Sequence, residues 1–327
     1  MANNYVNNPN EYVEVITLKG KKKEIITYKK NKYGLELRKS HKRILRLIKK
    51  YKSSKCSFAY KQKTSTKNAL QPHMNSNLFI KMDISSFFRS IKLDLFLEVM
   101  GEAFEYKDEI KECFYDNALP IGFITSPKIS DMYLYNFDID VENYLSTHSN
   151  LFYSRYCDDI MISTMSNDFS ELHALKSFIV KKLLKLGLKI NEEKYRVFDI
   201  KVDKTVTFLG LNITEKEGNR TITISKTFIV KTLDKLKEYY ELVNQKRTIS
   251  GYLRDCNKGI IVVDKDTIEE KVAEFIKINK TVWHYHHQIC SRVSYIHYNS
   301  LYAYNYFLKK HKNWFGAEWK RISRPHD

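Results

Sequence analysis

The sequence is poor in the features that mark secreted, membrane-spanning or loop-rich proteins. Its five cysteines are scattered, odd in number and without a Cys-x-x-Cys pair, which argues against a disulfide framework and for a reducing compartment. No apolar run approaches the length needed to cross a membrane. The first residues, MANNYVNNPNEYVEV, lack the charged and apolar regions of a signal peptide. With only 10 Gly and 5 Pro, no long flexible linker divides the chain. We therefore expect a cytoplasmic protein with no membrane contact.

Acidic residues are also scarce relative to basic ones. The chain has 56 Lys and Arg against 38 Asp and Glu, a formal net charge of +18. Residues 19–55 form the most basic stretch, with 16 Lys or Arg against Glu24 and Glu36. Such an excess of one sign opposes compaction unless a polyanion offsets it, so nucleic acid is the expected class of partner.

Hydrophobic periodicity predicts an α+β protein. A strand at 78–84 is followed by helical sequence from about Ser86, and a Pro- and Gly-containing loop at 119–127 leads into another helix. A hairpin around residue 158 and an amphipathic helix at 172–186 complete a β-α-β-β-α pattern of the split βαβ kind. Residues 35–51 predict a basic amphipathic helix. Further along, TVTFLGLNIT and RTITIS predict two strands, and the chain after Lys226 is mainly helical with a break between Gly251 and Asp264.

Two adjacent carboxylates lie inside the hairpin FYSRYCDDIMIS, at Asp158 and Asp159. They repel each other, and a half-buried turn is a costly place for them without a counter-charge. Asp83 ends the apolar strand LFIKMD, and side-by-side pairing of the strands would bring it to the same place. Carboxylates suit Mg²⁺, and two such ions can clamp a phosphoryl transfer. The alternative is that Asp158 and Asp159 only form the turn, and from spacing alone both interpretations stay open.

Five segments occur in a specific order: KMDISSFFRSI, LPIGFITSPKISDMYLYNFD, RYCDD, LGLKINEEKYRVF and FLGLNI. With them the chain resembles reverse transcriptases, most of all the bacterial retron and defence-associated kinds, which include abortive-infection enzymes. The resemblance runs from about Cys56 to Ile213 and resumes weakly at SRVSYIHYNSLYAYNYFLKKHK. It implies a right-hand polymerase with fingers at 1–78 and part of 92–118, a ferredoxin-like palm at 79–215, and a mainly helical thumb at 216–327.

The resemblance also assigns roles to individual residues. The metal-binding and catalytic carboxylates would be Asp83, Asp158 and Asp159, with the carbonyl of Ile84 near the metals. The incoming nucleotide would meet Phe88 beneath its sugar, Ile121 and Gly122 in its pocket, and three lysines near its triphosphate: Lys194, Lys22 and Lys23. The primer end would contact Tyr156, Phe208, Leu209 and Gly210.

Two positions depart from the family pattern. Ile121 stands in LPIG where the family commonly has Gln, whose amide helps to line the nucleotide pocket, so template-guided selection is in question. Cys157 replaces the more usual Ala or Met before Asp158. That change is small and apolar, and need not alter activity.

The activity that the resemblance implies is that of an RNA-directed DNA polymerase, which adds dNTPs to a 3′ end. The implied cofactor is a pair of Mg²⁺ ions, with Mn²⁺ as an alternative. A dedicated non-coding RNA would be the template and partner, DNA the product, and anti-phage defence the role. A homo-oligomer or a partner protein from a defence operon stays open. The alternatives are template-independent or repeat-sequence DNA synthesis, and an RNA-binding scaffold without catalysis.

Other polar residues have simpler interpretations. Three aspartates after the loop are expected to be solvated or to cap helices: Asp131, Asp138 and Asp140. The segment with Lys63, Lys67, Asn68 and His73 is expected to contact template or nucleotide, or else to lie on the surface. The set His284, His287 and Cys290 would give only three ligands for zinc, one short of a closed structural site.

Overall fold

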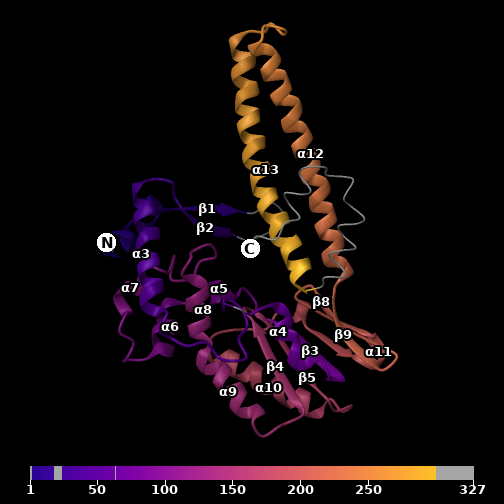
Figure 1. Ribbon diagram of the computed structural model, residues 1–327. Helices are drawn as coiled ribbons and strands as arrows, with labels where there is room; N and C mark the ends of the chain where they lie inside the picture. Colours follow the sequence, from indigo (N-terminus) through magenta and orange to yellow (C-terminus); the bar gives the residue numbers. More distant parts are fainter. Residues whose placement is uncertain (1, 18–23, 63, 300–327) are drawn as a thin grey trace. The chain divides into compact units, whose positions relative to one another are not determined.

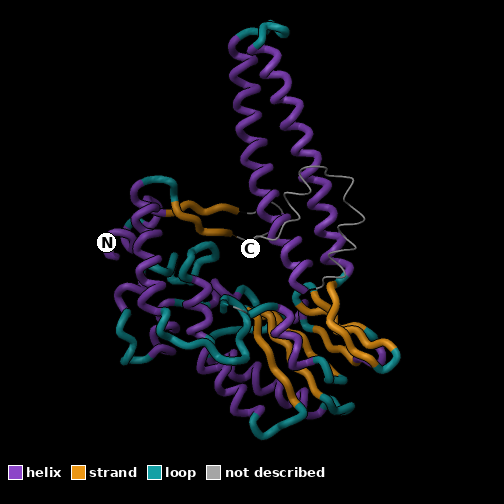
Figure 2. Tube along the Cα trace, viewed as in Figure 1, coloured by secondary structure: helices purple, strands orange, loops and turns teal. Residues whose placement is uncertain are grey.

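The structure is a computed structural model that describes residues 2–17, 24–62 and 64–299, and Figures 1 and 2 show its elements. The chain divides into two compact units. The first consists of Met1–Phe208 and Ile213–Thr221, and the second of Leu209–Asn212 and Ile222–Asp327.

The first unit holds most of the secondary structure. Its elements in chain order are α1 (Ala2–Asn7), α2 (Pro9–Tyr12), β1 (Val13–Thr17), β2 (Glu24–Tyr28), α3 (Lys32–Ile48), α4 (Thr66–Leu70), η1 (Gln71–His73), β3 (Leu78–Asp83), α5 (Phe87–Ser90), α6 (Leu93–Met100), α7 (Lys107–Lys111), α8 (Ser126–Tyr133), α9 (Tyr135–Leu145), β4 (Leu151–Tyr156), β5 (Asp159–Thr164), α10 (Ser170–Lys185), η2 (Glu192–Lys194), β6 (Arg196–Asp199), α11 (Ile200–Asp203) and β7 (Thr205–Phe208). The unit boundary passes through β8 (Leu211–Lys216) and β9 (Asn219–Ile224).

The central sheet has the strand order β4-β5-β3-β6, and its strand pairs are antiparallel. Helices precede β4 and follow β5, so the chain runs strand, helices, hairpin, helix, strand. That connectivity and order are those of a ferredoxin-like split βαβ sheet. The predicted α+β class and the three strands predicted between 78 and 200 are therefore confirmed, whereas the edge strand β6 was not predicted.

The two faces of this sheet differ because successive side chains in a strand point to opposite sides. One face carries buried apolar side chains of the main core, such as Ile80, Met82, Ile160 and Ile162. Helix α10 contacts β3 and β5, and α9 contacts β4. On β3 and β5 the other face carries Phe79, Lys81, Asp83, Asp159, Met161 and Ser163. The register therefore gathers most polar side chains of both strands, including Asp83 and Asp159, on the face opposite the core.

The second unit is built on two long helices, α12 (Lys226–Asn257) and α13 (Lys265–Asn299), which pack along each other. Their buried side chains include Leu236, Val243 and Ile289. The break in helix was predicted between Gly251 and Asp264, but α12 continues through Gly251 and the helices are interrupted only at 258–264. A single glycine costs a helix only about 1 kcal/mol relative to alanine, so packing against α13 outweighs it.

One predicted strand is in fact two. TVTFLGLNIT contains β7, a turn at Leu209 and Gly210, and β8. Both turn residues have positive φ, 53° and 82°, as the type I′ hairpin turn requires at its two central positions. A three-stranded sheet of order β7-β8-β9 results.

Among the described residues, no helix combines the length and the hydrophobicity that a membrane crossing requires.

His73 was expected at a template contact or on the surface, and both expectations are wrong. Its side chain is fully buried, and its two ring nitrogens lie 2.6 Å from Ser163 Oγ and 2.8 Å from Ser154 Oγ. It thereby ties β4 to β5, the strands of the hairpin that carries Asp158. Asn68 serves locally in a capping box with Ser65, and Lys63 lies outside the described residues.

His73 predicts a pH dependence of stability. Burial lowers the pKa of His73 to about 3, so between that value and about 6.5 only the unfolded chain takes up the proton. Stability from this group is present above about pH 6.5 and declines as the pH falls. The stability difference between the wild type and His73→Asn should shrink by roughly 2 kcal/mol between pH 7 and 5 in denaturant titrations. His173→Asn, at an exposed histidine, is the control, and a pH-independent difference for His73→Asn would contradict this account.

Candidate functional site

Three aspartates meet at one end of the central sheet. Asp83, the last residue of β3, is the direct partner of Asp159, the first residue of β5. Tyr156 at the end of β4 pairs with Asp159 from the other side. Asp158 lies in the two-residue turn between β4 and β5, and its carbonyl accepts a hydrogen bond of 2.9 Å from the Ile84 amide. The strand register therefore brings together carboxylates from two distant segments of the chain.

The aspartates are close enough to perturb one another. The pKa of Asp159 is raised to about 6, mainly by burial and also by the negative charges of Asp158 and Asp83, although Lys81 and Lys194 oppose the shift. Asp83 is only 5% exposed. Such a cluster needs positive charge nearby, because desolvated like charges disfavour ionisation.

Lys194 supplies one positive charge. Its Nζ lies 2.8 Å from Asp83 Oδ1, and this hydrogen bond raises the pKa of Lys194. The chain reaches Asp83 after α10 ends and turns at Gly187, whose φ is +67°. The Asn191 amide then donates to the Asp83 carbonyl over 2.7 Å, and η2 follows. Lys194 was predicted near a triphosphate, and the structure places it on one of the carboxylates.

The donor set fits a divalent cation in its chemistry. Three carboxylates share one end of the sheet, and Lys194 balances one of their charges. Within the described residues, no three His, Cys, Asp or Glu side chains are grouped closely enough to hold a metal ion as they stand. One oxygen of Asp83 is bound to Lys194, so Lys194 competes with a cation for this carboxylate.

Two adjacent phenylalanines follow the carboxylate of β3. Ser86, with φ 48°, turns the chain into α5. Phe87 is 3% exposed and belongs to the main core, whereas Phe88 is only partly buried against it. The two residues thus have different environments, and Phe88 retains exposed surface near the end of β3.

The loop with Ile121 and Gly122 is joined to β2. The Ile26 amide donates to the Ile121 carbonyl over 2.8 Å. A Cβ on Gly122, where φ is +117°, would lie 2.4 Å from the Ile26 carbonyl oxygen, so only glycine allows this approach.

A cavity of about 230 Å³ adjoins this loop, with Ile121, Ile26, Glu24 and Arg89 among its lining residues. Arg89 directly follows Phe88 and pairs with Glu24 on β2. Arg89 was not predicted from sequence. Its position beside the two phenylalanines is the signal that could have drawn attention to it.

The remaining predicted residues have distinct environments. Tyr156 is partly buried against the main core. Phe208 is fully buried, so its side chain is not available to a ligand. Leu209 forms the β7–β8 turn with Gly210, and its carbonyl accepts a 2.7 Å hydrogen bond from the Tyr295 hydroxyl. Lys22 and Lys23 lie outside the described residues, as do the side chains of His284 and Cys290 of the weak zinc candidate.

The expectation that Asp131 and Asp138 are solvated or capping residues is wrong. They are 4% and 0% exposed, and both bind the guanidinium of Arg155, which is itself 1% exposed. A buried arginine requires paired acids, and Arg155 lies inside a strand with apolar neighbours, which is the signal that sequence reasoning missed. Asp140 pairs with Lys182 and stays substantially exposed.

Burial would raise the pKa of Asp131, but the charge of Arg155 and hydrogen bonds from Ser53, Ser57 and Arg155 hold it below its usual value. Asp131 is therefore ionised within this buried cluster.

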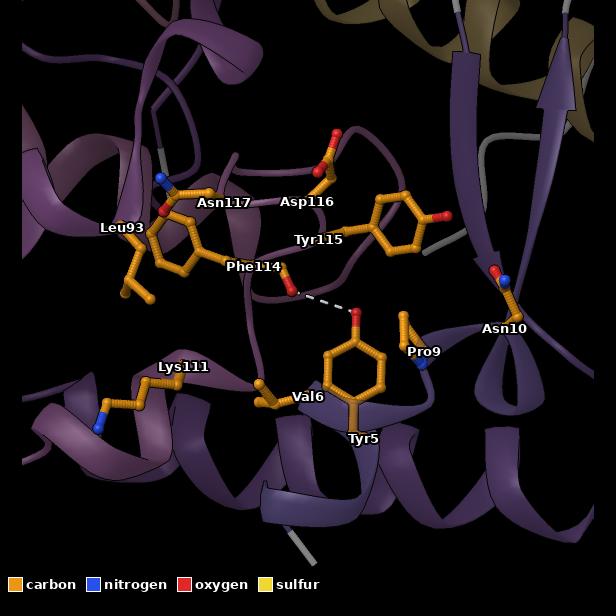
Figure 3. Close-up of a pocket in the computed structure, with 10 residues that line it drawn as sticks. All are labelled: Tyr5, Val6, Pro9, Asn10, Leu93, Lys111, Phe114, Tyr115, Asp116 and Asn117. Atoms are coloured by element: carbon orange, nitrogen blue, oxygen red, sulfur yellow. Dashed lines mark hydrogen bonds between the residues drawn. The ribbon is translucent and has the colours of Figure 1, made fainter.

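A cavity of about 520 Å³ lies elsewhere in the first unit, between α1 and the segment around Phe114 (Figure 3). Tyr5 donates a hydrogen bond to the Phe114 carbonyl at its edge. None of the predicted site residues lines it, so cavity size does not identify the functional site.

Comparisons with known proteins agree with the sequence resemblance. Residues 22–213 match the family model described as reverse transcriptase (RNA-dependent DNA polymerase). The Retron Ec86 reverse transcriptase of Escherichia coli is 27% identical over 176 residues, covering 52% of this chain and 53% of that protein. The Retron Ec48 reverse transcriptase of the same species is 34% identical over 133 residues, covering 38% and 32%. The chain thus spans about a third to a half of the length of these relatives.

Among solved structures, apo telomerase from Candida tropicalis is similar with a TM-score of 0.48 and 14% sequence identity, covering 95% of this chain and 68% of that one. That similarity is too low to support an argument about function, which rests on the family match and on the geometry of the aspartates.

Proposed function

The chain belongs to the reverse transcriptase family, and we propose that it extends a nucleic-acid 3′ end with deoxynucleotides copied from RNA. The observation that carries this proposal is the pairing of Asp83 with Asp159 beside Asp158. Carboxylates from two strands, converging at one end of a palm-like sheet, can hold the divalent cations that assist phosphoryl transfer.

In this proposal each side chain has a definite task. Asp83, Asp158 and Asp159 hold two Mg²⁺ ions, which when bound lower the pKa of the 3′-hydroxyl and stabilise charge on the transferred phosphoryl group. Lys194, released from Asp83, pairs with the triphosphate. Phe88 supports the sugar of the incoming nucleotide, and Ile121 lines its pocket. Tyr156 and the turn at Leu209 and Gly210 position the primer.

The basic helix α3 is proposed to bind the phosphate backbone. Its buried side includes Leu37, Ile44 and Ile48, so its cations project on the opposite, exposed side. These exposed cations are Lys32, Arg38, Lys39, Lys42, Arg43 and Arg46. No acidic residue occurs between Glu36 and Asp83. Like charges four residues apart destabilise a helix by a few tenths of a kcal/mol per pair, and a polyanion removes that repulsion.

The similarity to retron reverse transcriptases supports a dedicated non-coding RNA as template and a role in anti-phage defence. One observation favours a second candidate, DNA synthesis without a template or of repeated sequence: an aliphatic side chain, Ile121, lines the cavity beside β2 and offers no hydrogen bond to a nucleotide. Sequencing the nucleic acid that co-purifies with the protein distinguishes the two, because only templated synthesis gives DNA complementary to the bound RNA.

The first prediction concerns the carboxylates. Asp158→Asn keeps the shape of the side chain and removes one charge, so Mg²⁺-dependent dNTP incorporation on an RNA-templated primer should fall to background. Melting temperature and RNA affinity should stay close to the wild type. Asp140→Asn, which removes an equal charge at a salt bridge with Lys182, is the matched control. Near-normal incorporation by a folded Asp158→Asn protein would refute the assignment.

The second prediction concerns α3. The logarithm of RNA affinity should fall linearly with the logarithm of salt concentration, by roughly 0.7 per phosphate neutralised on single-stranded RNA. Replacing Arg38, Lys42 and Arg46 together by Gln should therefore reduce the slope by about 2, as measured by filter binding between about 50 and 200 mM salt.

The control replaces Lys181, Lys185 and Lys216, which are also exposed, and removes the same total charge. Equal losses of slope in the two triple variants would show that net charge, and not the face of α3, determines binding.

The third prediction concerns sugar selection. A ring under C2′ of the incoming nucleotide leaves no room for a 2′-hydroxyl and offers it no hydrogen-bond partner. Phe88→Ala should therefore raise rNTP use relative to dNTP use by at least about tenfold, equivalent to 1.4 kcal/mol. The neighbouring Phe87→Ala should instead cost about 3–5 kcal/mol of stability without changing sugar choice. If folded Phe88→Ala stays as strict for dNTPs as the wild type, Phe88 does not select the sugar.

A further inference from the structure

Arg155 is the centre of a buried charge cluster behind the turn that carries Asp158. Its Nε lies 2.9 Å from Asp138 Oδ1, and its Nη2 lies 2.6 Å from Asp138 Oδ2 and 3.1 Å from Asp131 Oδ1. Ser57 donates to Asp131 over 2.6 Å, and Tyr153 donates to Asp138 over 2.7 Å. The guanidinium is thus held in one orientation by two acids, each of which is oriented by a hydroxyl group.

Stability alone does not account for this cluster. Two buried carboxylates face one guanidinium, and replacing buried ion pairs by well-packed apolar side chains is often neutral or stabilising. Arg155 pairs with Ile160 across the β4–β5 ladder, so it lies on the core face of the sheet, opposite Asp159. A further contact of the guanidinium links the cluster to the turn that carries Asp158.

That contact is to the turn itself. Arg155 Nη1 donates a 3.1 Å hydrogen bond to the carbonyl of Cys157. Cys157 has a φ of +61° and is the first of the two turn residues. Asp158, the second turn residue, is not among the residues with positive φ. A two-residue hairpin turn with positive φ at its first central position alone is typical of the II′ kind, which normally has glycine there. A side chain makes this conformation unfavourable, so the turn needs contacts that hold it.

Three hydrogen bonds provide them: Arg155 to the Cys157 carbonyl, the Tyr60 hydroxyl to Cys157 Sγ over 2.9 Å, and the Ile84 amide to the Asp158 carbonyl. Of these donors only Arg155 is itself fixed by a charged, fully buried network. The other side-chain donor, Tyr60, is 53% exposed and binds a weak acceptor.

We propose that Arg155 is a positioning residue, whose guanidinium holds the Cys157 peptide in its left-handed conformation and thereby keeps the Asp158 carboxylate beside Asp83 and Asp159. This inference rests on the proposed polymerase function. Asp131 and Asp138 act through Arg155 and touch no reacting group. The same cluster explains why Cys157 is accepted at a position that favours glycine.

The test begins with Arg155→Lys, which keeps the charge but cannot reach both acids and the Cys157 carbonyl with a planar fork. Displacing a reacting group by about 1 Å can cost up to about a hundredfold in rate. We expect kcat for dNTP incorporation to fall at least about tenfold, while KM for dNTP changes less than about threefold. Tyr153→Phe is the matched control, because it removes a hydrogen bond from the same cluster but does not touch the turn. It should lower the melting temperature and leave kcat within about twofold.

A double-mutant cycle with Cys157→Gly tests whether Arg155 acts through the backbone conformation of Cys157. Glycine adopts positive φ without penalty, so the turn then depends less on Arg155. In the Arg155→Lys background, Cys157→Gly should recover about fivefold in kcat beyond its effect in the wild type. The same cycle can be measured on stability. The change that Cys157→Gly makes in the unfolding equilibrium constant should differ by at least about threefold between the wild-type and Arg155→Lys backgrounds.

The outcomes separate the two proposals. If the wild type incorporates no dNTP, the polymerase function fails, and the coupling of unfolding constants alone decides the role of Arg155. Unchanged kcat in folded Arg155→Lys, or additive effects of the two substitutions, would overturn the positioning role. If Arg155→Lys does not fold, a folded and active Arg155→Lys/Cys157→Gly protein supports the proposal, and failure of both to fold assigns Arg155 to stability alone.

Discussion

The antiparallel register between β3 and β5 is the constraint on which the rest of the site depends. Side chains alternate along each strand. A shift of the strand pairing by one residue would therefore turn Asp83 toward the core and Met82 toward the opposite, polar face of the sheet. The apolar set that faces α9 and α10 makes any other register costly. The packing of the core therefore determines the position of the carboxylates, and residues that never contact a substrate decide where two of the three acids lie.

Charge is distributed in this molecule on two very different scales. Across the chain, basic residues exceed acidic ones by a wide margin and are exposed along α3. At the end of β3 the balance is reversed, because three aspartates lie together and Lys194 pairs directly with one of them, Asp83. A polyanionic backbone is attracted to the first kind of surface and repelled by the second. The contrast suits a protein that binds phosphates over a large area but reserves one small region for cations.

Much of this architecture can be predicted from the sequence, because strands, helices and turns follow from local patterns. The strand at Asp83, the hairpin at Asp158 and the helix ending at Gly187 could all be placed in advance. Contacts between distant residues could not. Arg155, Asp131 and Asp138 read as ordinary polar residues until the fold removes them from water, and His73 looks like a surface residue until two serines surround it. The direct pairing of Lys194 with Asp83 likewise depends on how η2 returns to β3.

The close approach at Gly122 has a mechanical consequence. The backbone of β2 contacts the loop at Ile121 without an intervening side chain, and Glu24 on the same strand holds Arg89, which is adjacent to Phe88. A displacement of the β1–β2 hairpin would therefore move Ile121 and the segment of Phe88 and Arg89 at the same time. Glu24, Ile26, Arg89 and Ile121 all line the same cavity, so a bend of the hairpin would change the shape of that cavity on two sides at once.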